Sequence, residues 1–178
     1  LNGTIVENEL DKFYPLDSAP TGIVANGDRY ESTYDEANES ALQSGITSDG
    51  PHNYYFGLRY DVDFVLGDYC GPLSYKFFGD DDMWAVLSVV KDDGTIDTTK
   101  QQIVVDLGGI HTKTTGEKDL WQVLSDNKFG VQRYVAGGAG REYQYRLTVL
   151  YMERGCNLSN CYMEFNIPNA VGAKIDSV

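Results

Sequence analysis

This chain lacks long apolar runs. No stretch approaches the roughly 20 apolar residues that a membrane-crossing helix needs. The N-terminal LNGTIVENEL also lacks the charged and apolar regions of a signal peptide. We therefore predict no direct membrane insertion by this segment. Because the chain does not begin with Met, we expect any targeting or anchoring sequence to lie outside it.

Positive charge is scarce. The chain has 14 Lys and Arg against 27 Asp and Glu, which gives a formal net charge of -13. The summed electrostatic field would repel phosphate backbones and anionic lipid surfaces. The composition therefore predicts no nucleic-acid partner.

Sequence signatures of catalysis are also missing. His52 and His111 are the two histidines, and the chain has no serine nucleophile elbow, phosphate-cradling glycine loop or HExxH helix. A glycosidase needs two carboxylates roughly 5 to 10 Å apart, and adjacent aspartates in one turn do not by themselves make that arrangement. We predict that the protein is not an enzyme.

Cysteines are few, and their spacing allows one local bridge. The chain has three, Cys70, Cys156 and Cys161. Cys156 and Cys161 bracket NLSN, a loop short enough for a hairpin tip closed by a disulfide, which would suit an oxidising compartment. The spacing does not establish the required Cβ geometry, so bridged and unbridged forms both stay open. We expect Cys70 to be a buried, small apolar residue.

Apolar and aromatic residues are plentiful, and they alternate. Of the 178 residues 42% are hydrophobic, enough for one core. The segment FGLRYDVDFVL at 56–66 places its aromatic and aliphatic residues at every second position, and YQYRLTVLY at 143–151 and CYMEFNI at 161–167 repeat this pattern. Period two is typical of half-buried strands.

Shorter β-rich runs at 83–90 and 101–108 flank KDDGT, whose Asp-Gly pair indicates a turn. Because one-faced sheets must cover their apolar sides, we predict a mainly β protein, an antiparallel β-sandwich. One or two short helices are expected, at 32–45 and 116–126. The whole chain, 1–178, is predicted to form one domain, with the polar segment 1–50 wrapping the sandwich.

Three consecutive aspartates interrupt the run FFGDDDMWAVL at 77–87. Either Asp80, Asp81 and Asp82 sit in a solvated polar turn, or a positive charge neutralises them. Adjacent carboxylates are natural ligands for Ca²⁺, which takes six to eight oxygens. We expect Trp84, two residues further on, to pack in the core.

The string FFGDDDMWAVL, followed by VVDLGGIH and LTVLYMERGCNLSN, resembles the fibro-slime branch of the PA14 superfamily. In that branch DDDxW, DLGGxH and a terminal YxER…SN recur in this order. The three motifs span 77–160, and with the flanking strands the resemblance extends over about 54–167. The resemblance implies a PA14-like β-sandwich of the kind found in bacterial surface proteins and adhesins.

Related PA14 lectins bind sugars through Ca²⁺, which is held by an Asp-Asp pair joined by a cis peptide and by a second loop late in the chain. The resemblance therefore implies Asp80, Asp81, Asn157 and Asn160 as metal ligands. Asp82, Ser159 and His111 are candidate ligand contacts, although His111 is better interpreted as a hydrogen-bonded lock between loops. We interpret Glu153 and Arg154 as part of a buried charge network with Asp82 or Asp106. Cysteines on both sides of the second loop are a departure from many relatives.

The sequence therefore predicts an extracellular, secreted or surface-anchored adhesin module. We expect it to bind Ca²⁺ and to recognise glycans or a receptor on a host or neighbouring cell. The alternative is a structural stalk or pilus domain whose metal only stabilises the fold.

Overall fold

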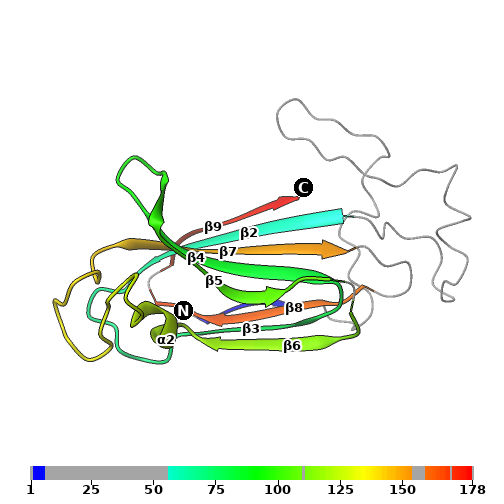
Figure 1. Ribbon diagram of the computed structural model, residues 1–178, viewed down its shortest axis with the longest axis horizontal. Coiled ribbons are helices and arrows are strands. Elements are labelled where there is room, and N and C mark those ends of the chain that lie inside the picture. The colour runs from blue at the N-terminus through cyan, green and yellow to red at the C-terminus, as the bar shows by residue number, and fades with distance from the viewer. Residues whose placement is uncertain (1, 7–55, 110, 154–158, 169, 178) are drawn as a thin grey trace, which may run out of the picture.

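The computed structural model describes residues 2–6, 56–109, 111–153, 159–168 and 170–177, which form two antiparallel sheets (Figure 1). The strand order of the larger sheet is β5-β4-β7-β2-β9, and that of the smaller is β1-β8-β3-β6. The predicted mainly β, two-sheet architecture is confirmed. The larger sheet contains β2 (Phe56–Val65), β4 (Asp82–Val90), β5 (Ile96–Leu107), β7 (Gln144–Glu153) and β9 (Ala170–Ser177). The smaller contains β1 (Asn2–Val6), β3 (Ser74–Gly79), β6 (Thr114–Asp119) and β8 (Cys161–Asn166).

The core lies between the sheets and follows the alternation of the sequence. Phe64 of β2 stacks on Tyr145 of β7, with ring centroids 5.5 Å apart. Across the sheets, Tyr60 meets Phe165 of β8 at 6.0 Å. Each of these side chains is buried, and burying such aromatic rings supplies much of the hydrophobic stabilisation.

Trp84 does not belong to this core. Its neighbours Met83 and Ala85 take the inward positions of β4, both fully buried, so Trp84 faces outward and is half-buried. The expectation of core packing for Trp84 is wrong, because successive side chains of a strand point to opposite faces.

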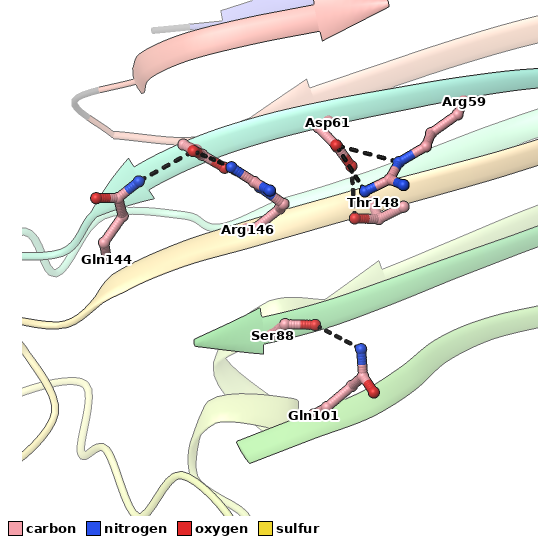
Figure 2. Close-up of polar contacts among 8 residues, drawn as sticks. Arg59, Asp61, Ser88, Gln101, Gln144, Arg146 and Thr148 are labelled. Atoms are coloured by element: carbon pink, nitrogen blue, oxygen red, sulfur yellow. Dashed lines mark hydrogen bonds and ion pairs between the residues drawn. The ribbon is translucent and has the colours of Figure 1, made fainter. Parts of the chain in front are cut away.

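The outer face of the larger sheet carries a paired polar ladder (Figure 2). Asp61 accepts hydrogen bonds from Arg59 Nε at 3.1 Å and Thr148 Oγ1 at 2.6 Å. Arg146 donates hydrogen bonds to both carboxylate oxygens of Asp63, from Nε at 2.6 Å and from Nη2 at 2.8 Å. The bonds of Asp61 to Thr148 and of Asp63 to Arg146 join β2 to β7, whereas the bond between Arg59 and Asp61 lies within β2.

The N-terminal residues add a strand that the sequence pattern did not predict. β1 pairs antiparallel with β8 at the edge of the smaller sheet, with Thr4 opposite Glu164. The rest of the predicted wrapping segment, and with it the helix expected at 32–45, lies outside the described residues.

Helix α2 (Leu120–Leu124) is shorter than the helix predicted at 116–126. Residues 116–119 belong to β6 instead, because that strand pairs with β3 up to Asp119, opposite Ser74. Asp119 then caps the helix by accepting from Trp121 N at 2.9 Å. No helix among the described residues is long and apolar enough to cross a membrane.

Candidate functional site: the acidic loop

The three aspartates lie at one end of the sandwich, where β3 runs into β4. Gly79, the last residue of β3, is opposite Cys161, the first residue of β8. Asp82, the first residue of β4, is opposite Met152, near the end of β7. The sheet registers therefore bring the aspartate loop beside residues 159–161. We call Asp80, Asp81, Asp82, Ser159 and Asn160 the acidic-loop site.

Two hydrogen bonds join Asp80 to Asn160. The backbone N of Asn160 donates to Asp80 Oδ1 at 2.9 Å, and its Nδ2 donates to Asp80 Oδ2 at 2.5 Å. Burial raises the pKa of Asp80 above its usual value of 3.8, the bonds from Asn160 lower it in part, and the charge of neighbouring Asp81 raises it. The ionised carboxylate is thus disfavoured here, and a bound cation would favour it.

Gly79 is what lets the two segments approach. A Cβ at this position would lie 2.5 Å from the backbone oxygen of Asn160 and 2.5 Å from the Phe77 ring. The Asn160 atom belongs to the backbone and the Phe77 ring is fully buried, so neither can move aside without cost, and glycine is the residue that fits. The sequence pattern does not single out Gly79, because the FFGDD string gives no indication that the Asn160 backbone packs against this position.

Asp81 occupies an unusual backbone conformation. Its φ is 58°, and within the described part of the chain it is the only non-glycine residue that has a positive φ. Its side chain is only 4% exposed. Left-handed backbone at a non-glycine residue costs free energy and often marks a functional turn. The described peptide bonds are all trans, so the cis bond between Asp80 and Asp81 that the PA14 resemblance implied is wrong.

Asp82 ties the loop to the DLGGIH segment. Its Oδ1 accepts a hydrogen bond from Gly109 N at 2.5 Å, and its side chain is buried. Gly109 has a φ of 109°, which a residue with a Cβ would adopt only with strain. Asp82 therefore holds the loop after β5 against the start of β4.

His111 contacts its own loop. Nδ1 lies 2.9 Å from the carbonyl oxygen of Thr112, and Nε2 lies 3.3 Å from that of Leu107. Both contacts are with backbone oxygens between residues 107 and 112. This placement matches the hydrogen-bonded interpretation of His111, with the lock lying within one loop rather than between two.

A cluster of buried polar groups around the Tyr151 hydroxyl lies beside the acidic-loop site. The hydroxyl of Tyr151 donates to Glu153 Oε2 at 2.9 Å and also lies 3.3 Å from Ser159 Oγ and 3.2 Å from the backbone oxygen of Asn160. Desolvation and the charge of Glu153 raise the pKa of Tyr151 far above its usual value. Period-two alternation marks Tyr151 only as a core residue, so the sequence missed its polar role.

The cluster also decides where two predicted residues lie. Ser159, a candidate ligand contact, is fully buried against Tyr151. Glu153 is buried as well, at 1% exposed. Of its two suggested partners, Asp82 is buried, whereas Asp106 is exposed and accepts from Gly108 N at 3.3 Å. Arg154 and Asn157 lie outside the described residues.

Cys70 is exposed, so the expectation that it is buried is wrong. It precedes a glycine and a proline in the loop between β2 and β3, where no strand turns its side chain inward. It forms no disulfide. Cys161 is buried at the start of β8. Cys156 lies outside the described residues, and its bridge to Cys161 stays a prediction.

The donor chemistry of the acidic-loop site suits Ca²⁺, because carboxylates, amides and main-chain carbonyls all offer oxygen. Within the described ranges, however, no three His, Cys, Asp or Glu side chains are grouped as metal ligands. The assigned amide of Asn160 turns its Nδ2, rather than its oxygen, toward Asp80. Coordination by the Asn160 side-chain oxygen would therefore require this amide to rotate.

Comparison with known proteins gives one distant similarity. Protein psiH of Dictyostelium discoideum is 29% identical over 129 residues. The alignment covers 72% of this chain but only 14% of psiH. No family model matches the chain, and no solved structure matches it.

Proposed function

We propose that this chain is an extracellular adhesin module of the PA14/fibro-slime type. It binds Ca²⁺ through Asp80 and Asp81, with Asn160 and Asn157 completing the site, and it recognises carbohydrate on a partner surface through the bound ion. The ion would neutralise the adjacent carboxylates and offer an open coordination position to sugar hydroxyls. The module acts by binding rather than by catalysis.

The observation that carries this proposal is the meeting of two loops. Asp80 and Asn160 lie 80 positions apart in the sequence, yet two hydrogen bonds join them. The carboxylate of Asp80 has its pKa raised by burial and by Asp81, as expected at a place that would gain from a cation. The distant similarity to psiH is compatible with this function but does not define it.

One observation favours the alternative, a stalk or pilus domain with a purely stabilising ion. Two polar groups of the site are directed inward, Ser159 toward Tyr151 and Asp82 toward Gly109, and Glu153 of the neighbouring cluster also contacts Tyr151. Groups held this way reinforce the loops and offer little to a ligand. In that case the same metal would bind, and the partner, if any, would be a protein receptor.

The experiment that separates the two is a glycan array with wild type and Asp81→Ala, each with Ca²⁺ and with chelator. Asp106→Ala is the matched control, since it removes one carboxylate from an exposed position of β5. For a lectin, wild type and the control retain glycans only with Ca²⁺, and Asp81→Ala retains none while circular dichroism shows it folded. Glycan binding that survives both chelation and the substitution would move the ligand site elsewhere. Ca²⁺ binding without any glycan retention would favour the stalk or a protein receptor.

A further inference from the structure

A hollow of about 680 Å³ lies along β5, formed by residues that the acidic-loop site does not use. It is lined by Val86, Gln101, Gln102, Ile103, Asp126 and Lys128. These residues come from β4, from β5 and from the turn that follows α2. The hollow is shallow and open to solvent, so a ligand would lie across it rather than be enclosed.

The polar wall of the hollow is held in place by its own backbone contacts. Asp126 N donates to Val123 O at 3.1 Å, and Asp126 O accepts from the N–H groups of Phe129 and Gly130 at 3.0 and 2.7 Å. Lys128 Nζ reaches across to the backbone oxygen of Gln101 at 3.0 Å. The turn is therefore fixed against β5, and ligand binding would not need to order it.

The floor of the hollow is also oriented. Gln101 Nε2 donates to Ser88 Oγ at 3.1 Å, and Figure 2 shows its amide oxygen directed away from Ser88. Beside it Ile103 is 57% exposed. The hollow thus combines an amide, a carboxylate and an ammonium group with an exposed aliphatic surface.

We propose that this hollow binds a saccharide, independently of any metal at the acidic-loop site. Sugar hydroxyls both donate and accept hydrogen bonds, so they suit the carboxylate of Asp126, the ammonium of Lys128 and the amide of Gln101 together. The C–H face of a sugar ring packs against an aliphatic surface such as Ile103. A ligand rich in phosphate would be repelled by Asp126 and by the net charge of -13.

An extended peptide added to the edge strand β5 is the main alternative, and the strand opposes it. The pairing of β5 with β4 shifts register twice, between Ala85 and Val86 and between Ser88 and Val89. The ammonium group of Lys128 donates to the backbone oxygen of Gln101. At an open sheet edge, a backbone oxygen of this kind would accept a hydrogen bond from the added strand. Bulges and lysines are common protections of sheet edges against pairing.

The test is an NMR titration of the ¹⁵N-labelled chain, in chelator, with methyl glycosides of neutral hexoses, N-acetylhexosamines and hexuronic acids. The expected result is saturable shifts centred on Gln101, Gln102 and Ile103 for at least one of these probes. Asp126→Asn should weaken that binding by about tenfold, as loss of a hydrogen bond to a charged group does. Ile103→Asp, which replaces the aliphatic surface by a charged group, should abolish it.

Two controls distinguish this site from the acidic-loop site. Asp92→Asn makes the same change at an exposed position of the turn between β4 and β5 and should leave the affinity unchanged. Asp81→Ala should also leave it unchanged, even if glycan retention that depends on Ca²⁺ is lost. The proposal is overturned if no probe shifts these residues in chelator, if Asp126→Asn and Ile103→Asp bind as wild type does, or if the shifts are elicited only by extended peptides.

Discussion

At the residue scale, single side chains of the acidic-loop site have environments that the triplet DDD does not predict. Asp80 accepts hydrogen bonds from Asn160, and Asp81 has a positive φ. Asp82 is buried and accepts a hydrogen bond from Gly109 N. The three aspartates are therefore neither equivalent nor a simple solvated turn. Each is held by a different part of the fold, so each substitution should have a different effect.

The pKa of Asp80 leads to a prediction about pH. Because burial raises it above 3.8, the protonated form is favoured by folding. The stabilisation from that proton is fully present below pH 3.8 and is lost as pH rises through the raised pKa. Ca²⁺ needs the ionised carboxylate, so calorimetry should show its affinity falling as pH is lowered through the raised pKa, before an ordinary aspartate would protonate.

Asp80→Asn is the control for this prediction. It removes the titrating group, so its remaining Ca²⁺ binding should be weaker and should lose the part of the pH dependence that comes from Asp80. A wild-type affinity that stays constant until pH 3.8 would contradict a role for Asp80 as a ligand.

At the scale of elements, close approach and loop clamps hold the strands and turns in place. β3 and β8 meet at Gly79 without room for a side chain. At the far end of the sandwich, the loops around 67–70 and 132–141 meet at Arg141, which is 1% exposed. Each of these two contacts depends on one residue, and substituting that residue tests the contact.

Replacing Gly79 with Ala should destabilise the protein by about 1–3 kcal/mol, as overpacking typically does. The new Cβ would meet the Asn160 backbone oxygen at 2.5 Å, so β8 must move and the bonds to Asp80 must lengthen. Urea denaturation measures the change. Gly116→Ala in the neighbouring β6 is the control, since its Cβ meets only terminal carbons of Leu107 and Val105 at 3.3 Å. Equal losses in the two variants would contradict the close-approach argument.

Arg141 should not be replaceable by Lys. Its guanidinium donates to the carbonyl oxygens of Gly67 at 2.8 Å, Tyr69 at 3.0 Å and Gln132 at 2.9 Å, and also to that of Arg133. An ammonium group cannot reproduce this planar fork. We expect Arg141→Lys to lose roughly 2–4 kcal/mol of stability, because buried acceptors are left without partners.

Hydrogen exchange gives the second measurement for Arg141. Amides of 66–73 and 132–143 should exchange faster in Arg141→Lys, while the strands near the acidic-loop site keep their protection. Arg133→Ala removes one bond to the Cys70 carbonyl from a more exposed side chain and should cost less. A uniform increase in exchange throughout the chain would mean that Arg141 stabilises the whole sandwich rather than these loops.

At the scale of the whole molecule, net charge and fold act in opposite directions. A charge of -13 on a chain of 178 residues destabilises the compact state through self-repulsion. The paired ladder of Arg59, Asp61, Asp63 and Arg146 offsets part of this repulsion on one face. The aspartate loop adds to it at one end, so a divalent ion bound there should stabilise the entire fold.

Calcium should therefore raise the melting temperature of the chelated protein. At 100 times its dissociation constant, an ion that binds only the folded form contributes about 2.7 kcal/mol. NaCl at matched ionic strength is the control, since it screens the charges without binding specifically. If thorough chelation followed by Ca²⁺ addition leaves the melting temperature unchanged, the metal proposal is wrong.

Local pattern predicted the fold class and the strands β2, β4, β5, β7 and β8, but not β1, β3, β6 or β9. Alternation along 56–66, 143–151 and 161–167 predicted which side chains face the core, because period two is a property of the strand itself. It misassigned Trp84 and Cys70, since aromatic or apolar character alone does not say which face a residue takes.

The acidic-loop site, by contrast, was decided by tertiary structure. The strand order β1-β8-β3-β6 sets Gly79 beside Cys161, and only then can Asn160 reach Asp80. The clamp of Arg141 and the hollow beside Ile103 arise in the same way, from segments that meet only in the folded chain. The sequence alone determined which residues could bury their side chains in strands, because that depends on neighbours two positions away. Which polar groups meet depended on strand order and register, which no local spacing encodes.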